Sequence, residues 1–185
     1  SRRLIKSYIF LNQKLIVYRK SLKNSLPTIQ PEIELNFCMA NQEDIPKLVH
    51  VMGLASPKAI EQRFKNGELC FVAKKEEEII HYSWICFGSV YMNEIEKEEK
   101  FDDSTPIIYD VFTQPQYRGK KIFPYALSQE FNYLSQKGHS YVYICALANN
   151  KSSIHGIKRA GFEVWQMIRY VKILGIKKYY SRRYI

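Results

Sequence analysis

The segment that most constrains the fold is a polar, basic loop placed between two apolar runs. The loop QPQYRGKK at 114–121 follows the apolar run PIIYDVFT and precedes a helical pattern that ends near Gly138. One face of this predicted helix is apolar at spacings typical of packing against a sheet; it carries Phe123, Leu127, Phe131 and Leu134. The segment therefore predicts a strand, a tight basic loop and a core-facing helix in succession.

The start of this helix is a candidate anion site. A helix N-terminus has unsatisfied N–H groups and about half a positive charge, so it suits a diphosphate. Gly119 allows a close approach of the backbone, and Pro124 fits the first turn, which needs no donor there. Arg118, Lys120 and Lys121 add positive charge. We interpret residues 118–122 as a phosphate cradle; a basic helix start on the surface is the alternative.

Composition indicates one globular domain with an uneven charge distribution. The chain has 185 residues, of which 46% are hydrophobic and 25% charged, with a net charge of +10. Residues 1–25 and 151–185 are strongly basic, whereas 26–150 have more acidic than basic side chains. Basic ends suit nucleic acid, a membrane surface or an acidic substrate, or they only keep the protein solvated.

The cysteine pattern and hydropathy suggest a cytoplasmic protein. No apolar run approaches the ~20 residues of a membrane span, and the N-terminus lacks the layout of a signal peptide. The cysteines lie far apart among apolar neighbours, which predicts reduced core residues and no metal site; they are Cys38, Cys70, Cys86 and Cys145.

Periodicity predicts the remaining elements of an α/β protein. We expect strands at 14–22, 34–40, 69–75, 79–87, 141–147 and 162–173. Helices are expected at 3–13, 41–53, 56–67 and 149–161, with Asn41 and Ser56 as N-caps. Residues 93–104 are interpreted as an acidic exposed loop and 177–185 as a basic aromatic tail. The order of elements predicts a mixed sheet covered by helices on both faces.

Two motifs resemble those of the GNAT acetyltransferases. QPQYRGKKIF resembles the Q/R-x-x-G-x-G/A acetyl-CoA loop, with Gln116, Gly119 and Lys121 at the defining positions. NNKSSIHGIKRAGF is similar to a later N-x-x-S/A…K-x-G-F segment; its matching residues are Asn150, Ser153, Gly161 and Phe162. The order of elements over about residues 33–171 agrees with the family as well.

The resemblance implies a splayed sheet of about six to seven strands with acetyl-CoA as acetyl donor. It implies a GNAT domain at 33–174, preceded by a helix/strand extension at 1–32 and followed by a basic tail at 175–185. Cofactor binding is assigned to Val111, Phe112, Thr113, Gln116, Arg118, Gly119, Lys120, Lys121, Ile122, Asn150 and Ser153. Backbone groups of 111–113 would hold the acetyl and pantetheine parts, and amides of 118–122 the pyrophosphate.

The family reaction is direct attack of an amine on the thioester, which needs a base or a water path. Asp110, in an apolar strand and facing away from Tyr109, is our candidate base; an ordinary residue paired with a basic neighbour is the alternative. The chain departs from the family twice. Lys121 stands where Gly or Ala is usual, and Ile157 stands where many members have a tyrosine that protonates the leaving thiolate.

The acceptor is the least determined part of the prediction. We favour a small-molecule amine, an amino sugar before another small amine; a protein α-amine is the alternative. Tyr109, Tyr143 and His81 are candidates for its pocket, although core packing is commoner for such residues. Two other functions stay open: a CoA-binding module without catalysis, and a nucleic-acid-binding protein that uses the basic termini, which we regard as the weaker of the two. The sequence does not indicate the oligomeric state.

Overall fold

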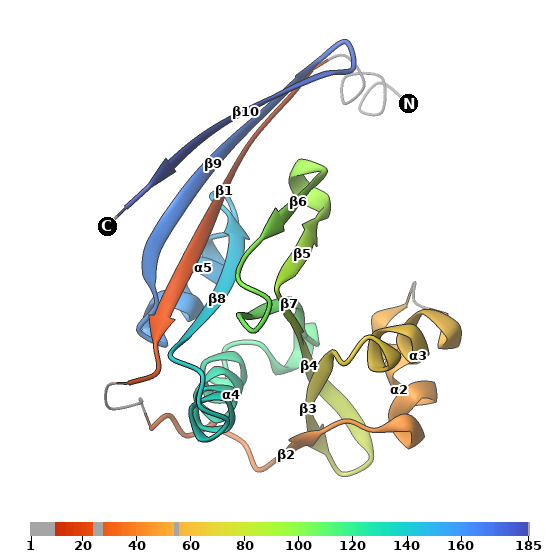
Figure 1. Cartoon of the computed structure of the whole chain (residues 1–185). Helices are drawn as coiled ribbons and strands as arrows, with labels where there is room; N and C mark the ends of the chain where they lie inside the picture. The colour runs from red at the N-terminus through yellow and green to blue at the C-terminus, as the bar shows by residue number, and fades with distance from the viewer. Residues whose placement is uncertain (1–9, 24–27, 54–55, 185) are drawn as a thin grey trace.

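The computed structural model describes residues 10–23, 28–53 and 56–184 (Figure 1). Most of the helix expected at 3–13 lies outside these residues. Its last four positions, 10–13, belong instead to strand β1 (Phe10–Ser21). The strand predicted at 14–22 is therefore confirmed and begins earlier than expected.

The predicted fold class is confirmed: a mixed central sheet has helices on both faces. The sheet has eight strands, in the order β10-β9-β1-β8-β7-β4-β3-β2. Besides β1 they are β2 (Asn36–Met39), β3 (Leu69–Lys75), β4 (Glu78–Phe87), β7 (Pro106–Thr113), β8 (Tyr141–Leu147), β9 (Glu163–Ile173) and β10 (Ile176–Arg183). Helices α2 (Ile45–Met52) and α3 (Pro57–Lys65) lie on one side, α4 (Ile122–Gln136) and α5 (Lys151–Arg159) on the other (Figure 1).

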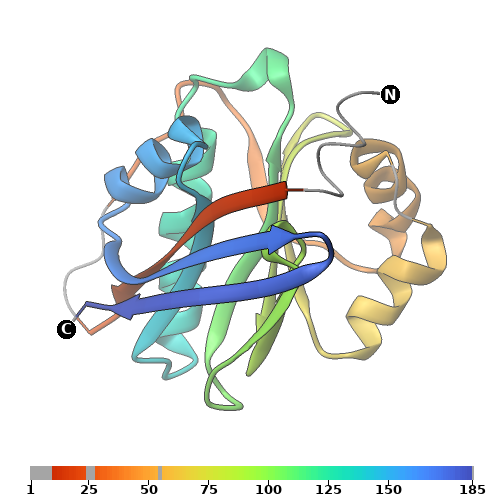
Figure 2. The ribbon, with the colours of Figure 1, turned by 90° about the horizontal axis from the view of Figure 1, so that it is seen from above.

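The strand count exceeds the expected six to seven because residues 176–183 join the sheet as an additional strand. β1 lies between β8 and β9 and is antiparallel to both, and β10 pairs with β9 as an edge strand (Figure 2). Residues 176–183, interpreted from sequence as part of a tail, form that edge. The domain boundaries at 32 and 174 stay predictions.

The sheet is splayed between β7 and β8. These strands are parallel, and the register pairs Ile107 with Tyr143 and Ile108 with Ile144. Beyond these positions the described parts of β7 and β8 are no longer paired, so their C-terminal ends diverge. Such a gap exposes backbone N–H and C=O groups that a regular sheet would satisfy.

The helix that follows β7 is seated by its apolar face, as its sequence predicts. Leu127, Phe131 and Leu134 of α4 are fully buried against the sheet. β8 contributes Val142 and Ile144 to the same core. This packing fixes the N-terminus of α4 at the open end of the splay.

The segment 93–104 is not the exposed acidic loop that we expected. It belongs to a hairpin made of β5 (Ser89–Met92), the short helix η2 (Asn93–Ile95) and β6 (Lys97–Lys100). Val90, Met92 and Ile95 are buried against β1 and β9. The charges dominate the sequence, but these apolar side chains lie on one face and dock the hairpin.

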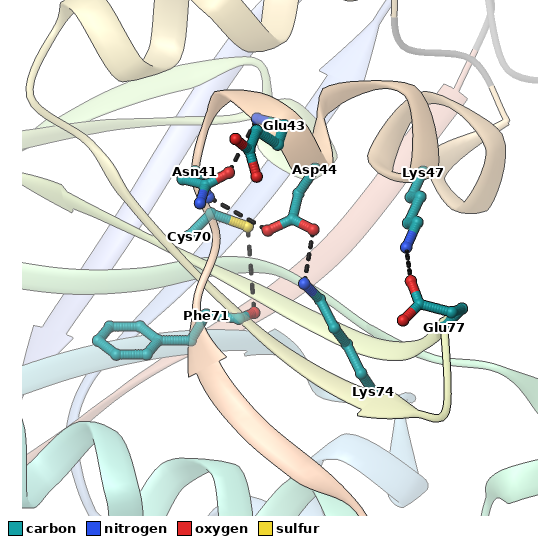
Figure 3. Close-up of polar contacts among 8 residues, drawn as sticks. All are labelled: Asn41, Glu43, Asp44, Lys47, Cys70, Phe71, Lys74 and Glu77. Carbon is teal, nitrogen blue, oxygen red and sulfur yellow. Dashed lines mark hydrogen bonds and ion pairs between the residues drawn. The ribbon is translucent and has the colours of Figure 1, made fainter.

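Helix α2 is tied to the β3–β4 hairpin by polar contacts (Figure 3). The predicted N-cap Asn41 forms a capping box with Asp44 at the start of η1 (Gln42–Asp44). The Lys74 ammonium lies 2.6 Å from Asp44 Oδ1, and Lys47 pairs with Glu77 in the β3–β4 turn. These contacts position α2 over one face of the sheet.

No helix in the described ranges is long and apolar enough to span a bilayer. No group of three or more His, Cys, Asp or Glu side chains among those residues is placed to hold a metal ion. The four cysteines are free thiols, and Cys70 and Cys86 are buried.

Candidate functional site

A cavity of about 410 Å³ opens where β7 and β8 diverge. The end of β7, the start of α4 and one face of α5 form its walls. Most of the residues predicted to bind the cofactor line it: Val111, Phe112, Thr113, Arg118, Gly119, Lys121, Ile122, Asn150 and Ser153. Gln116 and Lys120 do not. The Gln116 amide donates to Gln114 Oε1 at 2.6 Å on the exposed outer side of the loop.

The loop before α4 turns its backbone amides outward. After the short helix η3 (Pro115–Tyr117), Gly119 and Lys121 have φ angles of 81° and 58°. Lys121 occupies the N-cap position and makes no side-chain cap hydrogen bond. Among the described residues, no group accepts a hydrogen bond from the N–H groups of 119–123. This cluster of free donors at a helix N-terminus is the arrangement that binds a phosphate.

The positive φ of Lys121 suits the glycine that the family pattern allows at this place. Glycine adopts the left-handed region without steric cost, whereas a lysine there is strained. The Lys121 ammonium pairs with Glu32 Oε1 at 2.9 Å, and the Glu32 N–H donates to the Lys120 carbonyl. The hydrogen bond from Lys121 lowers the pKa of Glu32. The segment before β2 is thereby attached to the loop.

A bulge in β7 decides where Asp110 points. The pairs Tyr82–Phe112 and Trp84–Tyr109 leave Asp110 and Val111 together opposite one residue of β4. Asp110 has a φ of 46°. The extra residue breaks the alternation of the strand. Our expectation that Asp110 faces away from Tyr109 is therefore wrong, because both side chains reach Arg63.

Arg63 of α3 joins these groups in a half-buried polar cluster. Its guanidinium lies 2.7 Å from Asp110 Oδ2 and 5.2 Å from the centre of the Tyr109 ring. The Tyr109 hydroxyl donates to Glu68, and the Tyr82 hydroxyl donates to Asp110 at 3.5 Å. Asp110 is thus paired with a basic neighbour, the alternative left open by the sequence.

The tyrosines of this cluster hold their protons tightly. Burial raises the pKa of Tyr109 far above its ordinary value, and the hydrogen bond to Glu68 raises it further. Burial likewise raises the pKa of Tyr82, with the Asp110 charge adding to the effect. Both hydroxyls therefore act as hydrogen-bond donors to carboxylates at neutral pH.

Helix α5 contributes one polar face to the cavity. The Asn150 side chain caps the helix by accepting from the Ser153 N–H at 3.1 Å. Ile157 is 1% exposed and packs in the core, so the helix presents no hydroxyl from that position. Sequence reasoning missed Arg159 as a wall residue. Its spacing from Ser152, close to two helical turns, was the available signal.

His81 lies beneath the cavity and not in an acceptor pocket. It is fully buried on β4, and its Nδ1 is 2.8 Å from the Thr113 hydroxyl, which lines the cavity. Burial lowers its pKa to about 3, so the ring is neutral at physiological pH. Tyr143 also packs internally, with its ring edge-on to Trp165 at 5.0 Å.

Similarity to known proteins is found in the fold and not in the sequence. No protein-family model matches the sequence, and no curated protein matches it. Among solved structures, a GCN5-related N-acetyltransferase from Sphaerobacter thermophilus is 12% identical, with a TM-score of 0.65 over 98% of this chain and 55% of that one. The present chain therefore spans about half the length of that protein.

Two further structures are similar over most of their own length. One is a predicted acetyltransferase with acetyl-CoA from Clostridium acetobutylicum, 17% identical, with a TM-score of 0.50 over 70% of this chain and 90% of that one. The other is an aminoglycoside acetyltransferase from an uncultured soil metagenomic sample, in complex with trehalose. It is 15% identical, with a TM-score of 0.55 over 69% of this chain and 87% of that one. The overall fold of this chain is thus similar to that of GNAT acetyltransferases.

Proposed function

We propose that this chain transfers an acetyl group from acetyl-CoA to a primary amine by direct attack. The observation that carries the proposal is the set of free amides at 119–123, placed at the mouth of the cavity. A diphosphate satisfies such donors, and CoA contains one. When bound, acetyl-CoA supplies an activated thioester carbon for the amine to attack.

The residues around the cavity fit the remaining parts of this donor. The unpaired edge of β7 at 111–113 offers backbone N–H and C=O groups to the amide-containing pantetheine arm. Arg118 and Arg159 add positive charge at the wall. The Arg118 Nε donates to the Thr113 carbonyl at 3.0 Å, which holds the loop against the strand that carries the arm.

The Arg63 cluster supports an amine acceptor that arrives on the other face of β7. One guanidinium there faces two carboxylates, Asp110 and Glu68, so the cluster carries a net negative charge that favours an ammonium group. Asp110 remains our candidate base, and it must exchange its pairing with Arg63 for the amine. An amino sugar is the preferred acceptor, in keeping with the aminoglycoside acetyltransferase of similar fold.

The burial of Ile157 favours a second candidate, a CoA-binding module without turnover. No side-chain hydroxyl from that position can protonate the thiolate. A free thiol has a pKa of about 8.5, so solvent protonation is sufficient for a slow enzyme. Measured turnover therefore separates the two candidates.

The bounds of the proposed domain, residues 33–174, and a cytoplasmic location of the protein stay predictions.

The test combines calorimetry with an activity assay. Titration with CoA should give saturable heat, and release of free thiol from acetyl-CoA should require an added amine from a panel of amino sugars and polyamines. Gly119→Val should abolish CoA binding, because its side chain and altered φ preference disturb the free amides. Gly138→Val, at a positive-φ glycine beyond the far end of α4, is the matched control for strain. No heat with wild-type protein at millimolar CoA would refute the proposal; binding without thiol release would support the second candidate.

A further inference from the structure

The strands β1, β9 and β10 form a ribbon that projects beyond the body of the molecule (Figure 1). Its end is apolar and exposed. Phe10 is 54% exposed, Ile173 50%, Leu174 75% and Ile176 66%. The register pairs Phe10 with Ile173 and Ile173 with Ile176, so these side chains share one face at the end of the ribbon. We call these four residues the ribbon tip.

The turn at the tip contains a leucine in a backbone conformation that is unfavourable for it. Leu174 and Gly175, which join β9 to β10, have φ angles of 48° and 84°. Two-residue hairpin turns with both φ angles positive strongly favour Asn-Gly or Asp-Gly. A leucine in the left-handed region is strained, and here its side chain also faces solvent. This turn thus carries an apolar side chain at a position where asparagine or aspartate would be less strained.

A basic band lies directly behind the tip on the same face. Every second residue of a strand lies on the same face of a sheet. On the face that carries the tip, the first basic residue is Lys178 of β10, and the next are Lys14 of β1 and its cross-strand partner Arg169 of β9. Residues 10–16 and 167–182 contain no acidic side chain. The band is therefore uniformly positive and adjoins the apolar tip.

The opposite face of the ribbon is already occupied. There Lys172 and Lys177 pair with Glu96 of the β5–β6 hairpin at 2.9 Å and 2.7 Å. The Tyr179 hydroxyl donates to the Ile95 carbonyl at 3.0 Å. These contacts hold the ribbon against the hairpin and leave the tip and the basic band to face outward.

We propose that the ribbon tip inserts into the interfacial region of a bilayer that contains anionic phospholipids, while the basic band contacts their headgroups. Apolar side chains flanked by lysine and arginine are the composition that binds such surfaces. A nucleic acid would use the band but would leave the apolar tip in water. A second copy paired through β10 would bring Lys177, Lys178 and Arg182 against their own equivalents, which is unfavourable.

Vesicle sedimentation of the full chain tests this proposal. The protein should sediment with vesicles of phosphatidylcholine and phosphatidylglycerol, bind less to phosphatidylcholine alone, and dissociate as salt is raised. Leu174→Asn should weaken binding by about tenfold or more, because it removes one apolar side chain from the tip. It should not reduce stability, since asparagine suits the turn. Met39→Asn, at an exposed apolar position on the opposite edge of the sheet, should bind like wild type.

Two outcomes would overturn the proposal. Equal binding of wild type and Leu174→Asn, with normal unfolding curves for both, would show that the tip does not insert. Binding to a single-stranded oligonucleotide in place of vesicles, unaffected by Leu174→Asn, would assign the basic band to nucleic acid. CoA titration of Leu174→Asn should match wild type, so the result does not depend on the proposed acetyl transfer.

Discussion

Replacing Glu130 by glutamine should remove the loss of stability that this residue causes as pH rises from 5 to 8. Glu130 lies on α4 and is fully buried; its Oε1 accepts a hydrogen bond from the Ser83 hydroxyl. Its Oε2 has no hydrogen-bond partner among the described residues. Burial raises the pKa of this carboxyl to about 8, and the bond from Ser83 opposes the rise only in part. In the folded protein Glu130 is therefore mostly protonated at neutral pH.

The sign and size of the effect follow from proton linkage. In the unfolded chain the carboxyl ionises near its ordinary pKa of 4.5, whereas the folded protein keeps the proton up to about pH 8. The folded state binds more protons between these values, so stability falls as pH rises through that window. Each pH unit corresponds to about 1.36 kcal/mol. Between pH 5 and 8 the penalty from Glu130 amounts to roughly 4 kcal/mol.

Urea unfolding of wild type and Glu130→Gln at pH 5 and pH 8 measures this directly. The difference in unfolding free energy between the two proteins should shift by roughly 4 kcal/mol in favour of the variant on going to pH 8. Glu61→Gln, at an exposed position of α3, controls for the loss of a carboxyl and should leave the pH dependence unchanged. Parallel pH profiles for wild type and Glu130→Gln would refute the reasoning, because they would mean that Glu130 titrates alike in both states.

Three further changes test other parts of the structure. His81→Gln should flatten the acid limb of stability between pH 4.5 and 3, since there His81 is protonated in the unfolded chain and stays neutral in the folded one; acid titration followed by circular dichroism measures it. Gly156→Ala should destabilise by about 1–3 kcal/mol in thermal unfolding, because an added Cβ would lie 2.6 Å from Phe123 Cδ1, and Phe123→Leu should partly restore it. Ser56→Ala should cost about 1 kcal/mol in urea unfolding, since its hydroxyl accepts from the Ala59 N–H at the start of α3.

Local signals in the sequence predicted most helices and strands of the described chain. Helix α3 begins at Pro57 after the Ser56 cap, and α4 buries the face that its apolar spacing marks. Caps and periodicity work because they depend on residues within about two turns of one another. The same is true of the loop before α4, whose strand, glycine and basic residues are contiguous.

The parts that the sequence did not predict depend on contacts between distant segments. The pairing of Arg63 with Asp110 joins residues 47 apart, and no local pattern specifies it. The bulge at Asp110 adds one residue to β7, so a strict alternation assigns the wrong face beyond it. The hairpin at 89–100 was misread because its charges outnumber the apolar residues that dock it on β1 and β9.

Glu130 and His81 together predict a plateau in stability that neither gives alone. Both lie between β4 and α4, with Ser83 and His81 two residues apart on one face of the strand. Burial raises the pKa of the carboxyl to about 8 and lowers that of the imidazole to about 3. Between pH 4.5 and 6.5 the folded state keeps the Glu130 proton that the unfolded chain has released, and it lacks the His81 proton that the unfolded chain binds. The contributions of the two residues to the pH dependence of stability therefore cancel.

Stability should therefore be flat across that interval and fall on either side of it. A urea midpoint measured at half-unit steps of pH tests the cancellation. Glu130→Gln should make stability rise with pH through the interval, and His81→Gln should make it fall, whereas the double variant should be flat again. If the double variant instead kept either slope, another buried group would be titrating in that range, and the assignment to these two residues would be wrong.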